Sequence, residues 1–235
     1  MKVNIIKLLE FYDVYRADRA VHVTAITAFL GVDLVLGILR HYFEGEGYEC
    51  RITTTEPSAS GSRHRLDRWI VVTRDGSETW YQTEVKNWSV YTAGVPRTLT
   101  PGMSARALND YAYAMYEKQW NKRSGTFTDF ENLAKVFLPM DPPDGFIEGV
   151  AVARPLVCYW YPIVSSIRLR LASHFFTLSS CSPIFPEVDI FSVSLYLRHL
   201  ASRGTTSIDI NPGRFTTTLN HVNEITPPPP HLQGT

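Results

Sequence analysis

Apolar residues recur at helical spacing through residues 21–44 of this chain, where Ile26, Leu30 and Leu34 fall on one stripe. This spacing predicts a long helix with one apolar face. The stretch Gly45-Glu46-Gly47 follows the last periodic position, and its glycines predict the end of that helix. We therefore expect a buried amphipathic helix near the N-terminal end of the fold.

Three stretches with the alternation of β-strands come next, at residues 48–54, 67–73 and 79–86. Alternation places every second side chain on the same face of a sheet. A polar loop at 56–62 separates the first stretch from the second. Between the second and the third, Asp75-Gly76 is a dipeptide typical of two-residue hairpin turns. We predict three strands, the last two of which form a β-hairpin.

The remaining expected elements are a helical lead-in at 1–17, a helix at 104–122, a buried strand at 149–162, a strand at 188–193 followed by a helix at 194–202, a strand at 206–210 and a helix at 214–224. The order of helix, three strands, helix and strand favours an α/β fold in which helices flank a mixed central sheet. Additional α/β elements follow towards the C-terminus.

The chain has 235 residues, of which 44% are hydrophobic, so it can bury a substantial core. We expect a single domain at 1–225 and a proline-rich tail at 226–235. Val21–Leu39 has about the length of a membrane span, but Asp33 lies near its middle, where a bilayer disfavours a carboxylate. We therefore predict a buried helix and no contact with a membrane.

The three cysteines, Cys50, Cys158 and Cys181, are widely spaced. Their number and spacing fit neither a disulfide framework nor a zinc site. They are consistent with a reducing cytoplasm, which is the compartment we expect.

The tripeptide Glu84-Val85-Lys86 closes the third predicted strand and is the most informative feature of the sequence. The chain has six lysines, and only Lys86 has an acidic residue two positions before it. On a strand these two side chains face the same way, roughly 6.6–6.8 Å apart along the chain. Asp67, at the start of the preceding strand, would bring a second carboxylate to the same place. Two carboxylates beside an ammonium suit a hard cation and the hydrolysis of phosphodiesters.

This arrangement resembles the PD-(D/E)XK nuclease superfamily, whose members share the restriction-endonuclease-like fold. The resemblance rests on Leu66-Asp67 and Glu84-Val85-Lys86, separated by sixteen residues between the two acids, and on the order of elements over roughly residues 25–160. Leu66 stands where the name of the superfamily has a proline. Asp33, in the first long helix, is the candidate for the acid that family members tend to carry there.

The resemblance implies a metal-dependent nuclease that hydrolyses the phosphodiester bonds of DNA. Asp67, Glu84 and the backbone carbonyl of Val85 would hold Mg²⁺ or Mn²⁺, with Asp33 as a further ligand. Asp67, Glu84 and Lys86 would be the catalytic residues. Lys86 would orient the attacking water and stabilise the transition state by its charge.

Charge is balanced at 23 basic and 23 acidic residues, so the protein as a whole has no net charge to attract nucleic acid. DNA, or another nucleic acid, would have to be held by a local basic patch. Arg63, Arg65 and Arg68 form the densest basic cluster, and Lys118 is the candidate from the second long helix. We predict phosphate contacts from these four side chains.

Other interpretations of the same residues stay open. Glu84 and Lys86 alone would also fit an ion pair on a solvated strand. The chain could be a catalytically silent nuclease-fold module that binds nucleic acid or a protein partner. A glycosidase would use two carboxylates but leaves Lys86 without a role. A homodimer is possible in each case.

Overall fold

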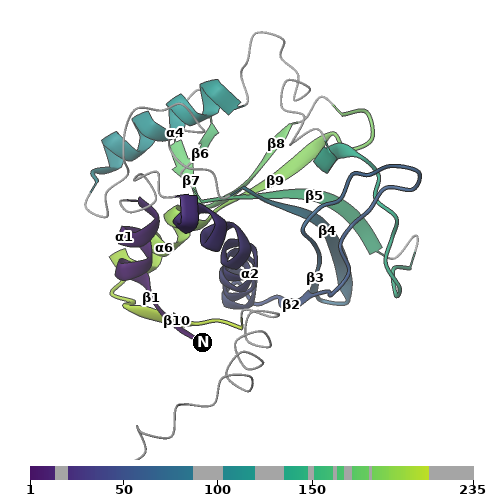
Figure 1. Ribbon diagram of the computed structural model, residues 1–235, viewed down its shortest axis with the longest axis horizontal. Coiled ribbons are helices and arrows are strands. Elements are labelled where there is room, and N and C mark those ends of the chain that lie inside the picture. Colours follow the sequence, from purple (N-terminus) through teal and green to yellow (C-terminus); the bar gives the residue numbers. More distant parts are fainter. Residues whose placement is uncertain are drawn as a thin grey trace, which may run out of the picture.

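The computed structural model describes residues 1–13, 21–86, 103–119, 135–147, 151–160, 163–166, 171–179 and 182–211 (Figure 1). The elements of the N-terminal half are β1 (Lys2–Asn4), α1 (Ile5–Asp13), α2 (Val21–Gly45), β2 (Glu49–Ile52), β3 (Arg68–Arg74), β4 (Ser77–Lys86) and α4 (Ala105–Gln119). The C-terminal half has the short 3₁₀ helix η3 (Lys135–Phe137), β5 (Ala151–Tyr159), β6 (Ile163–Ser166), β7 (Leu171–Ser173), β8 (Phe175–Ser179), β9 (Glu187–Ser192), α6 (Val193–Ser202) and β10 (Ser207–Asp209).

A six-stranded sheet with the order β2-β3-β4-β5-β9-β8 forms the centre of the fold. Strands β2, β3 and β4 form an antiparallel meander, β5 runs parallel to β4 and β9 parallel to β5, and β8 closes the far edge antiparallel to β9. The predicted mixed α/β architecture, with a central sheet flanked by helices, is therefore confirmed.

The β3–β4 hairpin turns at the predicted dipeptide. Arg74 pairs with Ser77, so Asp75 and Gly76 are the two residues of the loop. Both have positive φ, 51° at Asp75 and 77° at Gly76. Positive φ at both positions is the signature of a type I′ turn, whose twist matches that of the flanking strands. This local geometry fixes the register that brings the start of β3 beside the end of β4.

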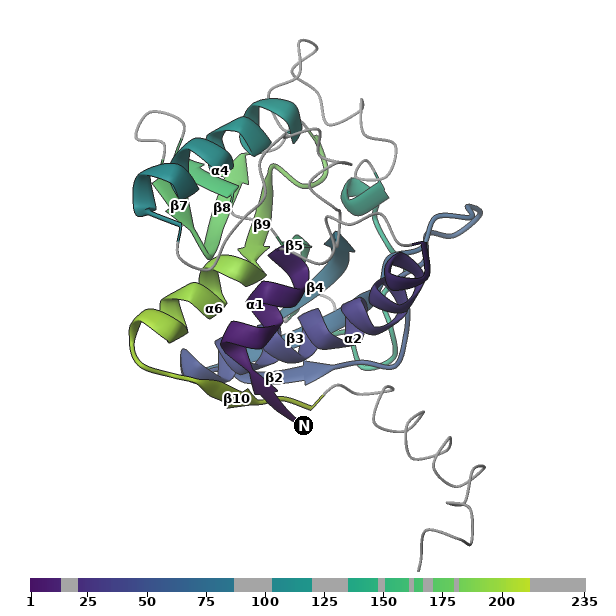
Figure 2. The same cartoon turned by 60° about the vertical axis from the view of Figure 1, so that its left-hand side comes forward.

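The two faces of the sheet pack against different partners. One face lies under α2, with α1 and α6 beside it, and Figures 1 and 2 show these three helices gathered on that side. The strand side chains buried there are Cys50, Ile70, Val72, Tyr81, Val85, Leu156, Cys158 and Phe191. We call this side the helix face.

The opposite side, which we call the η3 face, is covered by η3 and the segment after it. Its buried strand side chains are Trp69, Val71, Trp80, Val157, Tyr159, Val188 and Ile190, and they pack against Val136, Phe137 and Met140. The long helix α4 contacts the β6–β7 hairpin (Figure 2). Within the described ranges, the helical cover of the η3 face is therefore the three-residue helix η3.

Several short strands differ from the sequence-based expectation. Residues 2–4 form β1 rather than the start of a helix, because Val3 pairs across the fold with Ile208 of β10. The strands β6, β7 and β8 have three to five residues each. The predicted helix at 214–224 and the tail at 226–235 lie outside the described residues. Within the described residues, no helix is both long and apolar enough to span a membrane.

Candidate active site

Strand β4 presents a row of polar side chains to the η3 face. Gln82, Glu84 and Lys86 follow Trp80 at every second position, so all four point to the same side of the sheet. All three polar side chains are buried, and Glu84 is only 4% exposed. A strand that carries an amide, a carboxylate and an ammonium into a covered face bears a desolvation cost that ordinary packing does not explain.

Asp67 meets this row from the neighbouring strand. The last ladder pair of the hairpin joins Arg68 to Thr83, so Asp67 lies one position beyond it. The Asp67 N–H donates to the carbonyl of Thr83 at 3.0 Å. Its carboxylate Oδ2 accepts the backbone N–H of Val85 at 2.7 Å. The register thus sets Asp67 beside Glu84, on the same face of the sheet.

Electrostatic coupling between the two acids is visible in the pKa of Asp67. The pKa of this carboxyl is raised from 3.8 to about 6, first by burial and then by the charge of Glu84. The hydrogen bond from Val85 and the charges of Lys135 and Lys86 lower it. A partly desolvated acid coupled to a second carboxylate is typical of functional sites.

The two oxygens of Glu84 have different environments. Oε1 accepts a hydrogen bond from the ammonium of Lys86 at 2.5 Å and forms an ion pair with that of Lys135 at 2.9 Å. Oε2 is buried and has no hydrogen-bond partner among the described residues. An orphaned, buried carboxylate oxygen is costly, and it marks a position that a cation or a water can satisfy.

Asp189 shows how a structural carboxylate of the same fold differs. It is as buried as Glu84, but Arg154 donates to both of its oxygens, at 2.9 Å and 3.1 Å. Thr177 donates a further hydrogen bond to Oδ1 at 2.6 Å. Both oxygens of Asp189 therefore have hydrogen-bond donors, whereas one oxygen of Glu84 has none among the described residues.

Lys135 belongs to this site although no pattern in the sequence distinguishes it. It lies at the start of η3, in a stretch without clear periodicity, and reaches Glu84 only because η3 packs on the η3 face. The order of elements contains no signal for that contact. Lys86 stood out because an acidic residue lies two positions before it, and Lys135 has no such neighbour.

Asp33, the predicted acid of the first helix, is not grouped with Asp67 and Glu84. It is carried by α2, which packs on the helix face, whereas Glu84 and Lys86 point to the η3 face. Across the residues that the structure describes, no three Asp, Glu, His or Cys side chains are grouped so that they could hold a metal ion. Asp67 and Glu84 therefore have no third Asp, Glu, His or Cys side chain grouped with them among the described residues.

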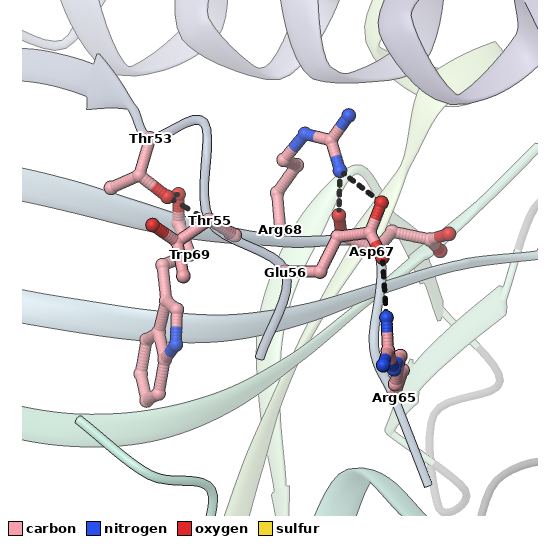
Figure 3. Close-up of polar contacts among 7 residues, drawn as sticks. All are labelled: Thr53, Thr55, Glu56, Arg65, Asp67, Arg68 and Trp69. Atoms are coloured by element: carbon pink, nitrogen blue, oxygen red, sulfur yellow. Dashed lines mark hydrogen bonds and ion pairs between the residues drawn. The ribbon is translucent and has the colours of Figure 1, made fainter. Parts of the chain in front are cut away.

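The predicted basic patch divides into exposed and buried side chains. Arg63 and Arg65 are exposed, while Arg68 is buried and points towards the helix face (Figure 3). The Arg68 guanidinium donates to Glu56 at 3.2 Å and to the carbonyl of Asp67 at 2.6 Å. Arg68 therefore links the side chain of Glu56 to the backbone at Asp67.

Glu56 lies between two of these arginines. Figure 3 shows it in contact with Arg68 on one side and with Arg65, at 4.0 Å, on the other. Its charge reduces the positive potential of this loop. The side chain of Lys118, the fourth predicted contact, lies outside the described part of the chain.

No protein-family model, curated protein or solved structure matches this chain. The functional assignment therefore rests on the residues and the geometry described above.

Proposed function

We propose that this protein is a metal-dependent nuclease of the PD-(D/E)XK type that hydrolyses DNA phosphodiesters. The observation that carries the proposal is the meeting of Asp67 with Glu84 and Lys86 at the open end of the β3–β4 hairpin. The order of α2, β2, β3, β4, α4 and β5, with β5 parallel to β4, agrees with the order that the resemblance implies. These features support the restriction-endonuclease-like fold as part of the same proposal.

The residues present fit a divalent cation. Asp67 and Glu84 supply two carboxylates, and the buried Oε2 of Glu84 lacks a hydrogen-bond partner among the described residues. Hard cations such as Mg²⁺ and Mn²⁺ prefer carboxylate oxygens and keep several waters. When bound, such a cation would supply Lewis-acid activation and neutralise charge on the phosphate. The carbonyl of Val85, between Glu84 and Lys86, is the proposed backbone ligand.

Each side chain has a distinct part in the hydrolysis. Asp67 and Glu84 hold the negative charge that binds and orients the cation. Lys86, held against Glu84, places a positive charge where it orients the attacking water and stabilises negative charge on the phosphate. Attack of water on phosphorus forms one P–O bond as another breaks, and a proton from the water ends on the leaving oxygen. Arg63 and Arg65 would hold neighbouring phosphates.

The test is cleavage of supercoiled plasmid and single-stranded DNA by the pure protein with Mg²⁺, Mn²⁺ or EDTA. We expect cleavage that requires a metal and that EDTA abolishes. Glu84→Gln should abolish it, because the amide removes a charge from the metal site. Asp75→Asn is the matched control, since Asp75 lies in the exposed hairpin turn and asparagine tolerates its positive φ. Equal cleavage by Glu84→Gln and wild type would refute the proposal.

A second candidate is a nuclease-fold module that binds nucleic acid or a protein partner without cutting. The observation that favours it is the pairing of Glu84 with two ammonium groups, which neutralises the carboxylate without a metal. Under this alternative the protein binds DNA in a mobility-shift assay with EDTA present and does not cleave DNA with any metal. That combination of results would replace the nuclease proposal.

A further inference from the structure

Lys135 binds Glu84 from outside the motif that the resemblance supplies. Its ammonium lies 2.9 Å from Glu84 Oε1 and donates to the backbone carbonyl of Arg65 at 2.8 Å. The side chain is 23% exposed, so it is partly shielded from solvent. Lys135 therefore connects η3 both to the carboxylate and to the loop that leads into Asp67.

The position of Lys135 is set by a clamp on η3. The Gln82 amide nitrogen donates to the carbonyl of Val136 at 2.6 Å and to that of Leu138 at 2.8 Å. Both partners are acceptors only, which fixes the nitrogen of the amide towards η3. The side chains of Val136 and Phe137 are buried in the core of the η3 face. Because η3 is held in this way, the fold itself places Lys135 against Glu84.

Among the residues that the structure describes, charge in the site is balanced before any metal binds. Asp67 and Glu84 carry two negative charges when ionised, and Lys86 and Lys135 carry two positive charges. Glu84 Oε1 is already paired with both ammonium groups. A divalent cation entering this space would be repelled by these two positive charges, because charges only a few Å apart interact strongly where water is largely excluded. One ammonium has to leave for the cation to bind well.

Lys86 and Lys135 differ in how easily each can leave. Lys86 belongs to the central strand β4, and its side chain is 9% exposed. Lys135 is more exposed and stands on a three-residue helix at the surface of the η3 face. Moving Lys135 breaks two contacts, to Glu84 and to the carbonyl of Arg65, without disturbing the sheet. Lys135 is therefore the ammonium that can be displaced.

We infer that Lys135 is an internal counter-ion of Glu84, which a divalent cation must displace from the carboxylate when it binds. The inference rests on the proposed function, because it takes Asp67 and Glu84 as the metal site. It makes Lys135 a positioning residue that sets the metal affinity of the site. The displacement removes the two contacts by which the Lys135 ammonium ties η3 to Glu84 and to the carbonyl of Arg65, so we expect η3 to be held less tightly when metal binds.

The test is calorimetric titration of Mn²⁺, without DNA, into wild type and Lys135→Met. Methionine keeps the length of the side chain and removes its charge, so we expect at least a tenfold tighter Kd. Lys135→Arg keeps a positive charge and should bind Mn²⁺ within about threefold of wild type. Lys7→Met, an exposed lysine of α1, is the matched control and should leave the Kd unchanged. Thermal melting checks that each variant is folded.

Hydrogen exchange of the wild-type protein supplies a second measurement that needs no variant. Backbone amides of residues 135–138 should exchange at least several-fold faster with saturating Mn²⁺ than without it, while amides of β3 and β4 should not. Unchanged exchange at 135–138 together with an unchanged Kd in Lys135→Met would overturn the displacement.

The outcomes separate this inference from the proposed function. If neither wild type nor Lys135→Met binds Mn²⁺, the metal site itself is refuted. If both bind Mn²⁺ with the same Kd, the inference fails and the nuclease proposal stands. Binding by Lys135→Met alone would support the inference in its strongest form, with Lys135 blocking the site.

Discussion

The carboxylate of Asp67, the residue just before β3, accepts the backbone N–H of Val85 in β4 at 2.7 Å. The side chain thereby satisfies a donor at the point where β3 and β4 stop pairing. An asparagine could accept the same hydrogen bond through its carbonyl oxygen. The negative charge of Asp67 is therefore not needed to close the sheet.

Asp67→Asn should stabilise the protein at neutral and alkaline pH. The folded-state pKa of Asp67 is raised from 3.8 to about 6, so folding disfavours its ionised form. Well below pH 3.8 the carboxyl is protonated in both states and carries no penalty. As pH rises through 6 the folded state ionises Asp67 at a cost of about 3 kcal/mol, which asparagine avoids. Urea unfolding in EDTA between pH 4 and pH 8 measures the difference.

The pH dependence of that difference is the decisive part. The free energy of unfolding of Asp67→Asn should exceed that of wild type at pH 8, and the two should converge towards pH 4. Asp75→Asn, in the exposed turn, should show no such trend. A gap between Asp67→Asn and wild type that stays constant with pH would mean that Asp67 is not desolvated in solution.

The hairpin and its acids were predictable because their signals are local. Asp75-Gly76 fixes the turn, the turn fixes the register, and the two-residue period of a strand then sets Glu84 and Lys86 on one face. Asp67 follows from the same register. None of these steps needs knowledge of how distant segments pack.

Contacts made by distant segments were not predictable in the same way. Lys135 reaches Glu84 through the packing of a three-residue helix whose sequence has no periodicity to reveal it. The pairing of Val3 with Ile208 joins the two ends of the described chain. In the sequence Arg68 belongs to a basic cluster, but in the structure it is the first residue of β3 and its side chain points to the helix face. These features depend on tertiary structure.

Gln82→Leu should release η3 from the sheet. The substitution leaves the carbonyls of Val136 and Leu138 without the amide donor, and each buried unsatisfied group costs roughly 1–3 kcal/mol. For the two carbonyls together we expect a loss of roughly 2–6 kcal/mol in the free energy of unfolding, measured in urea. Amides of residues 135–138 should exchange faster than in wild type. Unchanged stability would show that the Gln82 clamp does not hold η3 in solution.

Arg63→Ala and Arg65→Ala should weaken DNA binding and lower its dependence on salt. Both side chains are exposed, and each lost phosphate contact should reduce the slope of log K against log[salt] by about one. The measurement is fluorescence anisotropy with labelled DNA over a series of salt concentrations, in EDTA. An unchanged slope in the double variant would place the phosphate contacts elsewhere.

Arg68→Met provides the contrast within the same loop. Arg68 is buried and donates to Glu56 and to the carbonyl of Asp67, so its loss should destabilise the protein by roughly 1.5–3 kcal/mol. The salt dependence of DNA binding should stay as in wild type. A reduced slope in Arg68→Met would show that this guanidinium reaches DNA.

Lys86→Met should remove catalysis while preserving the metal site. Lys135 still binds Glu84 Oε1 in this variant, so the carboxylate stays paired and the fold should be retained. Losing one preorganised charge near the reacting phosphate typically costs ~10²–10³ in turnover. Binding of Mn²⁺ should not weaken, because a neighbouring positive charge is removed rather than a ligand.

Single-turnover cleavage of plasmid and calorimetric titration of Mn²⁺ measure the two effects separately. Lys7→Met, an exposed lysine of α1, should match wild type in both assays. Cleavage at the wild-type rate by Lys86→Met would assign Lys86 to structure alone and would remove the ammonium from the proposed mechanism.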